Sequence, residues 1–83
     1  MYKIIWSETA AGQLEKLDKK AAMVIVKKLE SAQKDPLHYL TKLKHMPFHK
    51  LRVGDYRVIV QLENNKMVIF VVEVGHRKNI YKK

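Results

Sequence analysis

Hydrophobic and polar positions divide the chain into short segments whose periodicity changes from strand-like to helix-like and back. Residues 2–6 combine β-branched and aromatic side chains, which predicts a strand, and Ser7 directly after them is a favoured helix N-cap. Apolar side chains then recur at helical spacing over residues 8–17, and again over residues 19–34 after a second cap, Asp18. The pattern therefore predicts an N-terminal strand followed by a hairpin of two helices.

The segment after the second predicted helix follows no single period. Asp35-Pro36 is expected to end that helix, because the residue before a proline disfavours the α conformation. Residues 37–47 mix isolated apolar side chains with lysine and histidine. We expect them to form an irregular connecting loop that makes some packed contacts.

The C-terminal half of the chain is typical of strands. Residues 48–53 and 56–62 predict two strands joined by a tight turn at Gly54, because glycine adopts positive φ at little cost. Residues 63–66 predict another turn. Residues 67–74 are almost continuously apolar, which indicates a strand in the interior of the sheet, covered on both sides.

These elements together predict an α+β fold. Gly75 is expected to end the last strand, so the final three strands form an antiparallel meander. One small sheet, made of this meander and the N-terminal strand, then packs on the two helices. The 83 residues fit a single domain, residues 1–83, with a thin core.

Composition narrows the class of protein. The chain has no cysteine, so neither disulfides nor thiolate metal sites supplement the core. No apolar run approaches the roughly 20 residues that span a bilayer, and no signal-like segment is visible. We therefore expect a cytoplasmic protein without a membrane partner.

Charge is the most unusual bulk property. Lys and Arg number 17 against 8 Asp and Glu, a formal net charge of +9, which favours polyanions or an acidic partner protein. The cations concentrate in residues 42–57 and 76–83, and the second segment is expected to lie as an ordered tail against the sheet near Arg57. A lysine-rich surface that only keeps the protein soluble is an equally good explanation of the charge alone.

Two short motifs in these charged segments resemble those of a known family. Residues 51–59, Leu-Arg-Val-Gly-Asp-Tyr-Arg-Val-Ile, look like the R-V-G-D-Y-R signature of the RelE/ParE superfamily of toxin–antitoxin toxins. Residues 74–77, Val-Gly-His-Arg, followed by Ile80 and Tyr81, look like its G-H-R…Y signature. The similarity covers essentially the whole chain and implies a RelE-like, microbial RNase-like fold.

The resemblance also implies a function. RelE-type members are ribosome-dependent endoribonucleases that cut mRNA in the A site, and a partner antitoxin neutralises each of them. The chain would then be the toxin of a type II toxin–antitoxin system, cleaving mRNA by metal-independent attack of a ribose 2′-hydroxyl. Its expected partners are a RelB-like antitoxin, the ribosome and mRNA, with no cofactor. ParE-type members share the fold but act on DNA gyrase, so gyrase inhibition is the alternative.

Residue roles follow from the resemblance and from the chemistry of phosphate. Guanidinium groups bind phosphoryl oxygens in bidentate fashion, and by similarity Arg57 and Arg77 would hold the scissile phosphate. Lys50 matches a lysine implicated in activating the nucleophile, and Tyr81 matches a tyrosine that orients or stacks the substrate. Additional catalytic candidates are His49 and His76, since imidazole titrates near neutral pH; candidates for RNA binding are Arg52, Lys44, Lys78, Lys82 and Lys83.

Structural explanations compete with several of these roles. Arg57 could be an ion-pair partner of Glu73 or Asp55, and Tyr81 could simply pack the tail onto the sheet. The chain also departs from the family at Phe48, where well-studied RelE enzymes carry a second lysine. That departure leaves open a third alternative, a catalytically weakened module that only binds its antitoxin.

Overall fold

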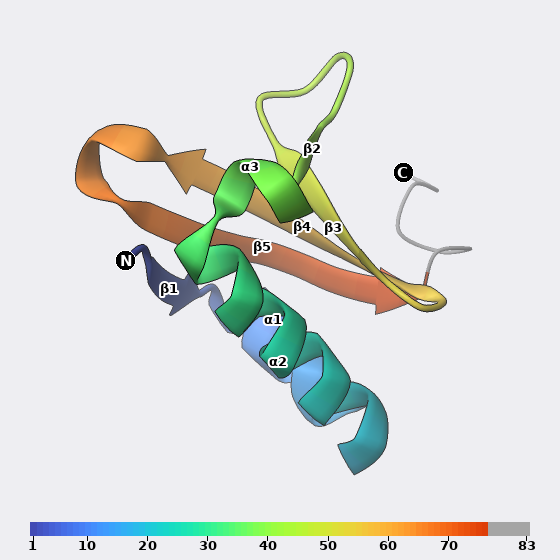
Figure 1. The fold of residues 1–83 in the computed structure, drawn as a ribbon. Helices are drawn as coiled ribbons and strands as arrows, with labels where there is room; N and C mark the ends of the chain where they lie inside the picture. The colour runs from blue at the N-terminus through green and yellow to red at the C-terminus, as the bar shows by residue number, and fades with distance from the viewer. Residues whose placement is uncertain (77–83) are drawn as a thin grey trace.

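The computed structural model describes residues 1–76 and consists there of one sheet packed against helices (Figure 1). In chain order the elements are β1 (Lys3–Trp6), α1 (Glu8–Glu15), α2 (Lys19–Lys34), α3 (Pro36–Tyr39), β2 (Thr41–Lys42), β3 (His49–Val53), β4 (Tyr56–Glu63), a 3₁₀ turn (Asn64–Lys66) and β5 (Val68–His76). The expected α+β class, the N-terminal strand and the helical hairpin are therefore confirmed.

Both predicted helix caps are present. Ser7 Oγ accepts a hydrogen bond from the Ala10 backbone N–H at 3.0 Å, and Asp18 Oδ1 accepts one from the Ala21 N–H at 2.8 Å. Each satisfies a backbone donor that has no partner within the first helical turn. The caps fix where α1 and α2 begin, and the two helices run in opposite directions across the sheet (Figure 1).

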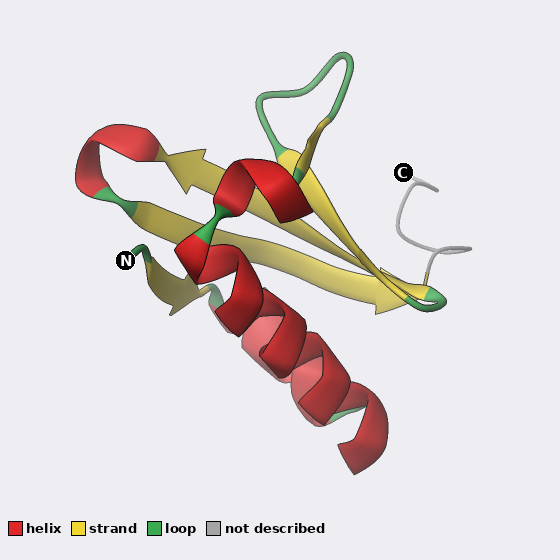
Figure 2. Cartoon of the chain, in the orientation of Figure 1, coloured by secondary structure: helices red, strands yellow, loops and turns green. Residues whose placement is uncertain are grey.

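The sheet has five strands in the order β1-β5-β4-β3-β2. Strands β3, β4 and β5 form the expected antiparallel meander, while β1 pairs in parallel with β5 at one edge. β5 is thus an interior strand, as predicted. Within residues 1–76 the helices lie on one face of the sheet only, so helices do not cover both sides of this strand (Figure 2).

The core lies between that face and the helices. Ile25 and Leu29 of α2 are fully buried and belong to one apolar cluster with Leu51 of β3, Val58 of β4 and Ile69 of β5. Fully burying a side chain of this size contributes about 1.5–3 kcal/mol. Among the described residues, no helix is long and apolar enough to cross a membrane.

The prediction of an irregular loop over residues 37–47 is wrong in part. Pro36 is the first residue of the short helix α3, a position where its missing N–H costs nothing. Thr41 and Lys42 then form β2, which pairs with β3 and extends the sheet beyond the predicted meander. The remaining connection between β2 and β3 projects from the sheet as a loop (Figure 2).

One predicted boundary in the C-terminal half is corrected, and one predicted turn is confirmed. Gly75 does not end the last strand, because it pairs with Arg57 and β5 continues to His76. The turn expected at residues 63–66 is a 3₁₀ turn that ends at Met67, whose φ of 53° is left-handed.

A β-bulge interrupts β5 in its middle. Ile59 pairs with Glu73 while Val60 pairs with Val71, so Val72 is an extra residue on β5. Bulges change which face of a sheet the following side chains occupy. Beyond the bulge, Val74 faces the core and Glu73 faces away from it.

The turn between β3 and β4 generates a stability prediction with an internal control. Gly54 has a φ of +57°, and Gly12 lies in α1; neither position has an atom within 4 Å of an added Cβ. Gly54→Ala should therefore destabilise the protein by about 1–2 kcal/mol through backbone strain alone. Gly12→Ala should stabilise it by about 0.5–1 kcal/mol, because alanine is the better helix former.

Urea unfolding of the two variants measures both effects. The change in the free energy of unfolding is expected to be negative for Gly54→Ala and positive for Gly12→Ala, although both replace glycine by alanine. A loss of stability in Gly12→Ala, or none in Gly54→Ala, would contradict this account of the two backbones.

Candidate active site

The cationic side chains of the central hairpin share the sheet face that carries no helix in the described part of the chain. Leu51 and Val58 point into the core, so the residues that alternate with them point the other way. Those residues are Lys50 and Arg52 on β3 and Arg57 on β4. The structure thus brings together three of the residues that the sequence proposed.

Register places two arginines directly opposite each other. Arg52 pairs with Arg57, one residue from each side of the Gly54 turn. Like charges directly opposite in an antiparallel pair destabilise the sheet. The Arg52–Arg57 pair therefore does not contribute to the stability of the sheet. Because it brings two guanidinium groups together, it is suited to bind an anionic ligand.

A second row of side chains crosses three strands next to the arginine pair. Lys50 pairs with Ile59, and Ile59 pairs on its other side with Glu73. Ile59 is only 6% exposed although it belongs to the helix-free face. In the arginine row, Gly75 is the β5 partner of Arg57 and adds no side chain beside the guanidinium.

Glu73 was considered from the sequence only as an ion-pair partner of Arg57. Its register makes it a diagonal neighbour of Arg57 on the same face, a relation in which Cα atoms are about 7–8 Å apart. The signal in the sequence was a single acidic residue inside the apolar run over residues 67–74. Which face it occupies depends on the bulge, and the sequence does not reveal the bulge.

The two histidines proposed as catalytic candidates are on the other face. His49 precedes Lys50 in β3 and pairs with Lys42 and Val60, and His76 pairs with Tyr56. The rings of Tyr56 and His76 are in edge contact, with centroids 5.7 Å apart. Neither imidazole belongs to the face that carries Lys50 and Arg57.

His49 instead has a local structural environment. Its Nδ1 atom is buried without a hydrogen-bond partner among the described residues. Burial, and to a lesser extent the positive charge of Lys42, lower the pKa of this imidazole below its ordinary value of 6.5. His49 is therefore held neutral in the folded protein at neutral pH.

The remaining site predictions fall at the margin of the structure or outside it. Lys44 is exposed in the turn between β2 and β3, and Phe48 is half-buried just before β3. The other predicted residues, Arg77, Lys78, Tyr81, Lys82 and Lys83, lie outside the described residues. Their roles, and the position of the tail near Arg57, stay predictions.

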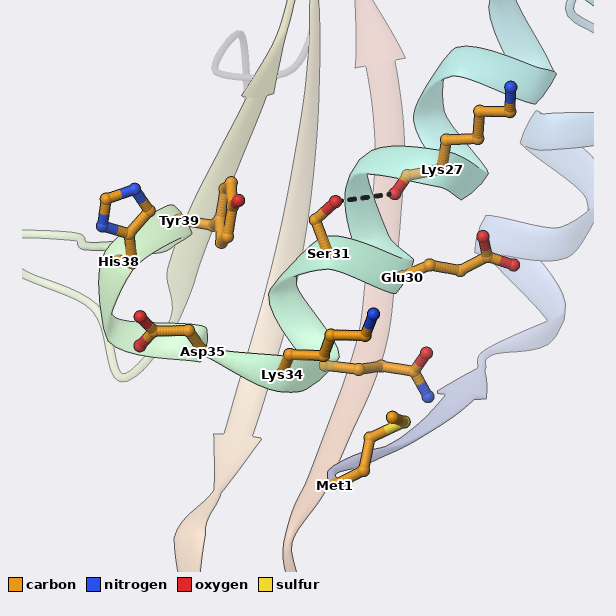
Figure 3. Close-up of a pocket in the computed structure, with 9 residues that line it drawn as sticks. Met1, Lys27, Glu30, Ser31, Lys34, Asp35, His38 and Tyr39 are labelled. Carbon is orange, nitrogen blue, oxygen red and sulfur yellow. Dashed lines mark hydrogen bonds between the residues drawn. The ribbon is translucent and has the colours of Figure 1, made fainter.

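A hollow of about 840 Å³ lies on the helix side of the molecule, beside α2 and α3. Figure 3 shows that side chains of both charges surround it, including Glu30 and Lys34 of α2, with Met1 at its edge. The site residues proposed above do not line this hollow. The hollow is therefore separate from the cationic face, the helix-free face of the sheet that carries Lys50, Arg52 and Arg57.

The lowered pKa of His49 predicts acid-sensitive stability. The unfolded chain takes up a proton at this imidazole near pH 6.5 and the folded chain only at lower pH, so stability falls as the pH drops through that interval. His49→Asn should remove this contribution. Thermal unfolding at pH 7.5 and pH 5 is expected to show a smaller loss of Tm on acidification in the variant than in the wild type.

His38→Asn is the matched control, because His38 is exposed on α3. This substitution should leave the pH dependence unchanged. Equal acid sensitivity in wild type and His49→Asn would contradict the assignment.

Comparison with known proteins places the whole chain in one family. A family model described as the ParE toxin of the type II toxin–antitoxin system, parDE, matches residues 4–81. A candidate toxin, RelE4 of Methanocaldococcus jannaschii, is 41% identical over 75 residues, which cover 86% of this chain and 78% of that protein. The mRNA interferase toxin RelE of Escherichia coli is 32% identical over 80 residues, which cover 93% of this chain and 84% of that protein.

Solved structures agree with these matches. The toxin–antitoxin complex RelBE2 of Mycobacterium tuberculosis has a TM-score of 0.84 at 22% identity over 92% of this chain and 98% of that chain, a likeness in fold alone. The intact E. coli RelBE toxin–antitoxin complex matches with a TM-score of 0.79 at 31% identity, over 92% of this chain and 96% of that chain. The chain belongs to the RelE/ParE family of type II toxin–antitoxin toxins.

Proposed function

We propose that the protein is a RelE-type toxin that acts as an endoribonuclease on ribosome-bound mRNA. A relative that matches 93% of the chain is an mRNA interferase toxin. The cleavage would occur in the ribosomal A site, without a metal, and would stop translation. The observation that carries the proposal is the cross-strand pair of Arg52 and Arg57 with Lys50 beside it on a face free of helices within residues 1–76.

That face has the chemistry that RNA cleavage needs at phosphorus. Attack of the 2′-hydroxyl on the adjacent phosphate builds negative charge on the phosphoryl oxygens. Positively charged donors already in position stabilise such charge more than water does, because they need not reorient. Arg57 can bind two of these oxygens at once, while Lys50 acts as a point charge.

The C-terminal residues complete the proposed site. Arg77 is proposed to hold the same phosphate near the leaving 5′-oxygen, and Tyr81 to orient or stack the substrate. Lys44, Lys78, Lys82 and Lys83 are proposed to bind the RNA backbone. The reaction forms a 2′,3′-cyclic phosphate and releases a 5′-hydroxyl.

The proposed regulator is a RelB-like antitoxin. Solved structures similar to this chain include RelE toxins in complex with RelB. A net charge of +9 favours an acidic or amphipathic partner. Binding of such a partner would block access of RNA to the cationic face.

Arg57 provides the test of the proposed function. Arg57→Ala should lower the cleavage rate about 10²–10³-fold, the usual cost of removing one preorganised donor. Arg57→Lys should recover part of it, since the charge stays but the bidentate geometry is lost. The measurement is primer extension on ribosome-programmed mRNA, which detects a new 5′-end at the A-site codon.

Lys66→Ala is the matched control. Lys66 is an exposed cation in the 3₁₀ turn, near the pair of Glu63 and Val68 and at the far end of the β4–β5 ladder from Arg57. Its removal should leave cleavage unchanged. Intact mRNA after incubation with folded, antitoxin-free wild-type protein would rule out the proposed function.

The ParE description of the matching family model favours one alternative, inhibition of DNA gyrase. A supercoiling assay separates the two functions, because gyrase inhibition with intact mRNA supports the alternative. A weakened module that only binds its antitoxin would instead show little toxicity on induction.

A further inference from the structure

The cationic face, taken by itself, lacks a proton acceptor. Protonated lysine and arginine donate hydrogen bonds but accept none. Lys50, Arg52 and Arg57 can therefore bind and stabilise a phosphate in their charged forms, but in those forms they cannot remove the proton from a 2′-hydroxyl. His49, which could accept a proton, belongs to the opposite face of β3.

Glu73 is the carboxylate that the fold brings beside Arg57 on this face. In an uninterrupted strand, Glu73 would follow Val71 onto the core face, because side chains alternate. The extra residue at Val72 reverses that alternation, so that Glu73 pairs with Ile59 and shares the face of Lys50 and Arg57. The irregularity in the sheet therefore determines that a carboxylate stands among the cations.

Side chains of α1 and its cap bind the β5 backbone on both sides of Glu73. Ser7 Oγ donates to the Val72 carbonyl oxygen at 3.0 Å, and the Val74 N–H donates to Gln13 Oε1 at 2.6 Å. These bonds hold the residues on either side of Glu73. The side chain is thus presented from a backbone that is fixed on both sides.

Strand spacing sets how far the charged side chains of this face lie from one another. Adjacent strands lie about 4.8 Å apart, so Lys50 and Glu73 stand about 10 Å apart with only Ile59 between them. Arg57 is the diagonal neighbour of Glu73, and Gly75 leaves the position beside Arg57 without a side chain. A phosphate bound by Arg57 would place the adjacent 2′-hydroxyl beside Glu73, within reach of the carboxylate.

We propose that Glu73 is the general base of the cleavage reaction, positioned by the bulge at Val72 and by Ser7 and Gln13. This inference rests on the proposed function and assigns the step that the cations cannot perform. The Glu73 carboxylate takes the proton of the 2′-hydroxyl as the bond from O2′ to phosphorus forms. The bond from phosphorus to O5′ breaks, the 5′-oxygen takes a proton from solvent, and Glu73 returns its proton to solvent.

Two substitutions at Glu73 separate proton transfer from packing. Glu73→Gln keeps the shape but removes the basic oxygen, and should lower the single-turnover cleavage rate about 10²–10⁴-fold. Glu73→Asp keeps a carboxylate on a shorter side chain, and should cleave at least about tenfold faster than Glu73→Gln. Glu63→Gln is the matched control, because Glu63 shares the helix-free face near the far end of β4 and should cleave at the wild-type rate.

The outcomes distinguish this inference from the proposed function. Failure of the wild type to cleave would overturn the proposed function itself. Two results would overturn only the assignment of the base, provided that the wild type cleaves. One is a cleavage rate of Glu73→Gln equal to that of the wild type. The other is a cleavage rate of Glu73→Gln equal to or higher than that of Glu73→Asp.

Gln13 tests the positioning role. Gln13→Met removes the acceptor for the Val74 N–H and should lower kcat while leaving KM unchanged, whereas Gln13→Glu keeps an acceptor oxygen and should restore kcat. Circular dichroism and thermal unfolding confirm that each variant is folded. A rise in KM with unchanged kcat, or no rescue by Gln13→Glu, would overturn the role of the bulge in placing Glu73.

Discussion

The hydrogen bond from the Val74 N–H to Gln13 Oε1, together with that from Ser7 Oγ to the Val72 carbonyl, is the constraint on which the arrangement of the sheet depends. A bulge leaves backbone groups without ladder partners, and leaving such groups buried and unpaired costs about 1–3 kcal/mol each. Gln13 of α1 and its cap Ser7 supply partners for two β5 backbone groups beside the bulge, beyond the part of β5 that pairs with β1. The position of α1, the bulge at Val72 and the face on which Glu73 lies are therefore linked.

One face of the sheet stabilises the fold, and the other face carries the charged side chains. On the helix side, the burial of Ile25 and Leu29 of α2 against apolar side chains of the strands stabilises the fold. The other face carries Arg52 opposite Arg57, a pairing that opposes folding. A small domain retains little surplus stability, so this cost has to be offset by the apolar side. The separation lets the charged face be suited to an anionic ligand without disturbing the core.

Sequence patterns predicted the features that depend on local chemistry. Ser7 and Asp18 cap helices because of their own side chains, and Gly54 turns the hairpin because of its own backbone freedom. The resemblance to the family also named Lys50, Arg52 and Arg57, which the structure places on one face of the sheet. Features that depend on a partner strand were missed: β2 has only two residues, and Gly75 remains in β5 because it pairs with Arg57. The bulge, and with it the facing of Glu73, depends on the same kind of non-local pairing.

The parallel pairing of β1 with β5 has a consequence for how the protein is made. The first strand, Lys3–Trp6, can find its place in the sheet only when residues 68–71 are available. Contacts this far apart in sequence are among the slowest to form, since the chain between them must first be ordered. A growing polypeptide therefore lacks both its sheet interior and Glu73 until residues 68–76 have been synthesised. By this order of assembly, the cationic residues of β3 and β4 are synthesised before the strand that completes their sheet and carries Glu73.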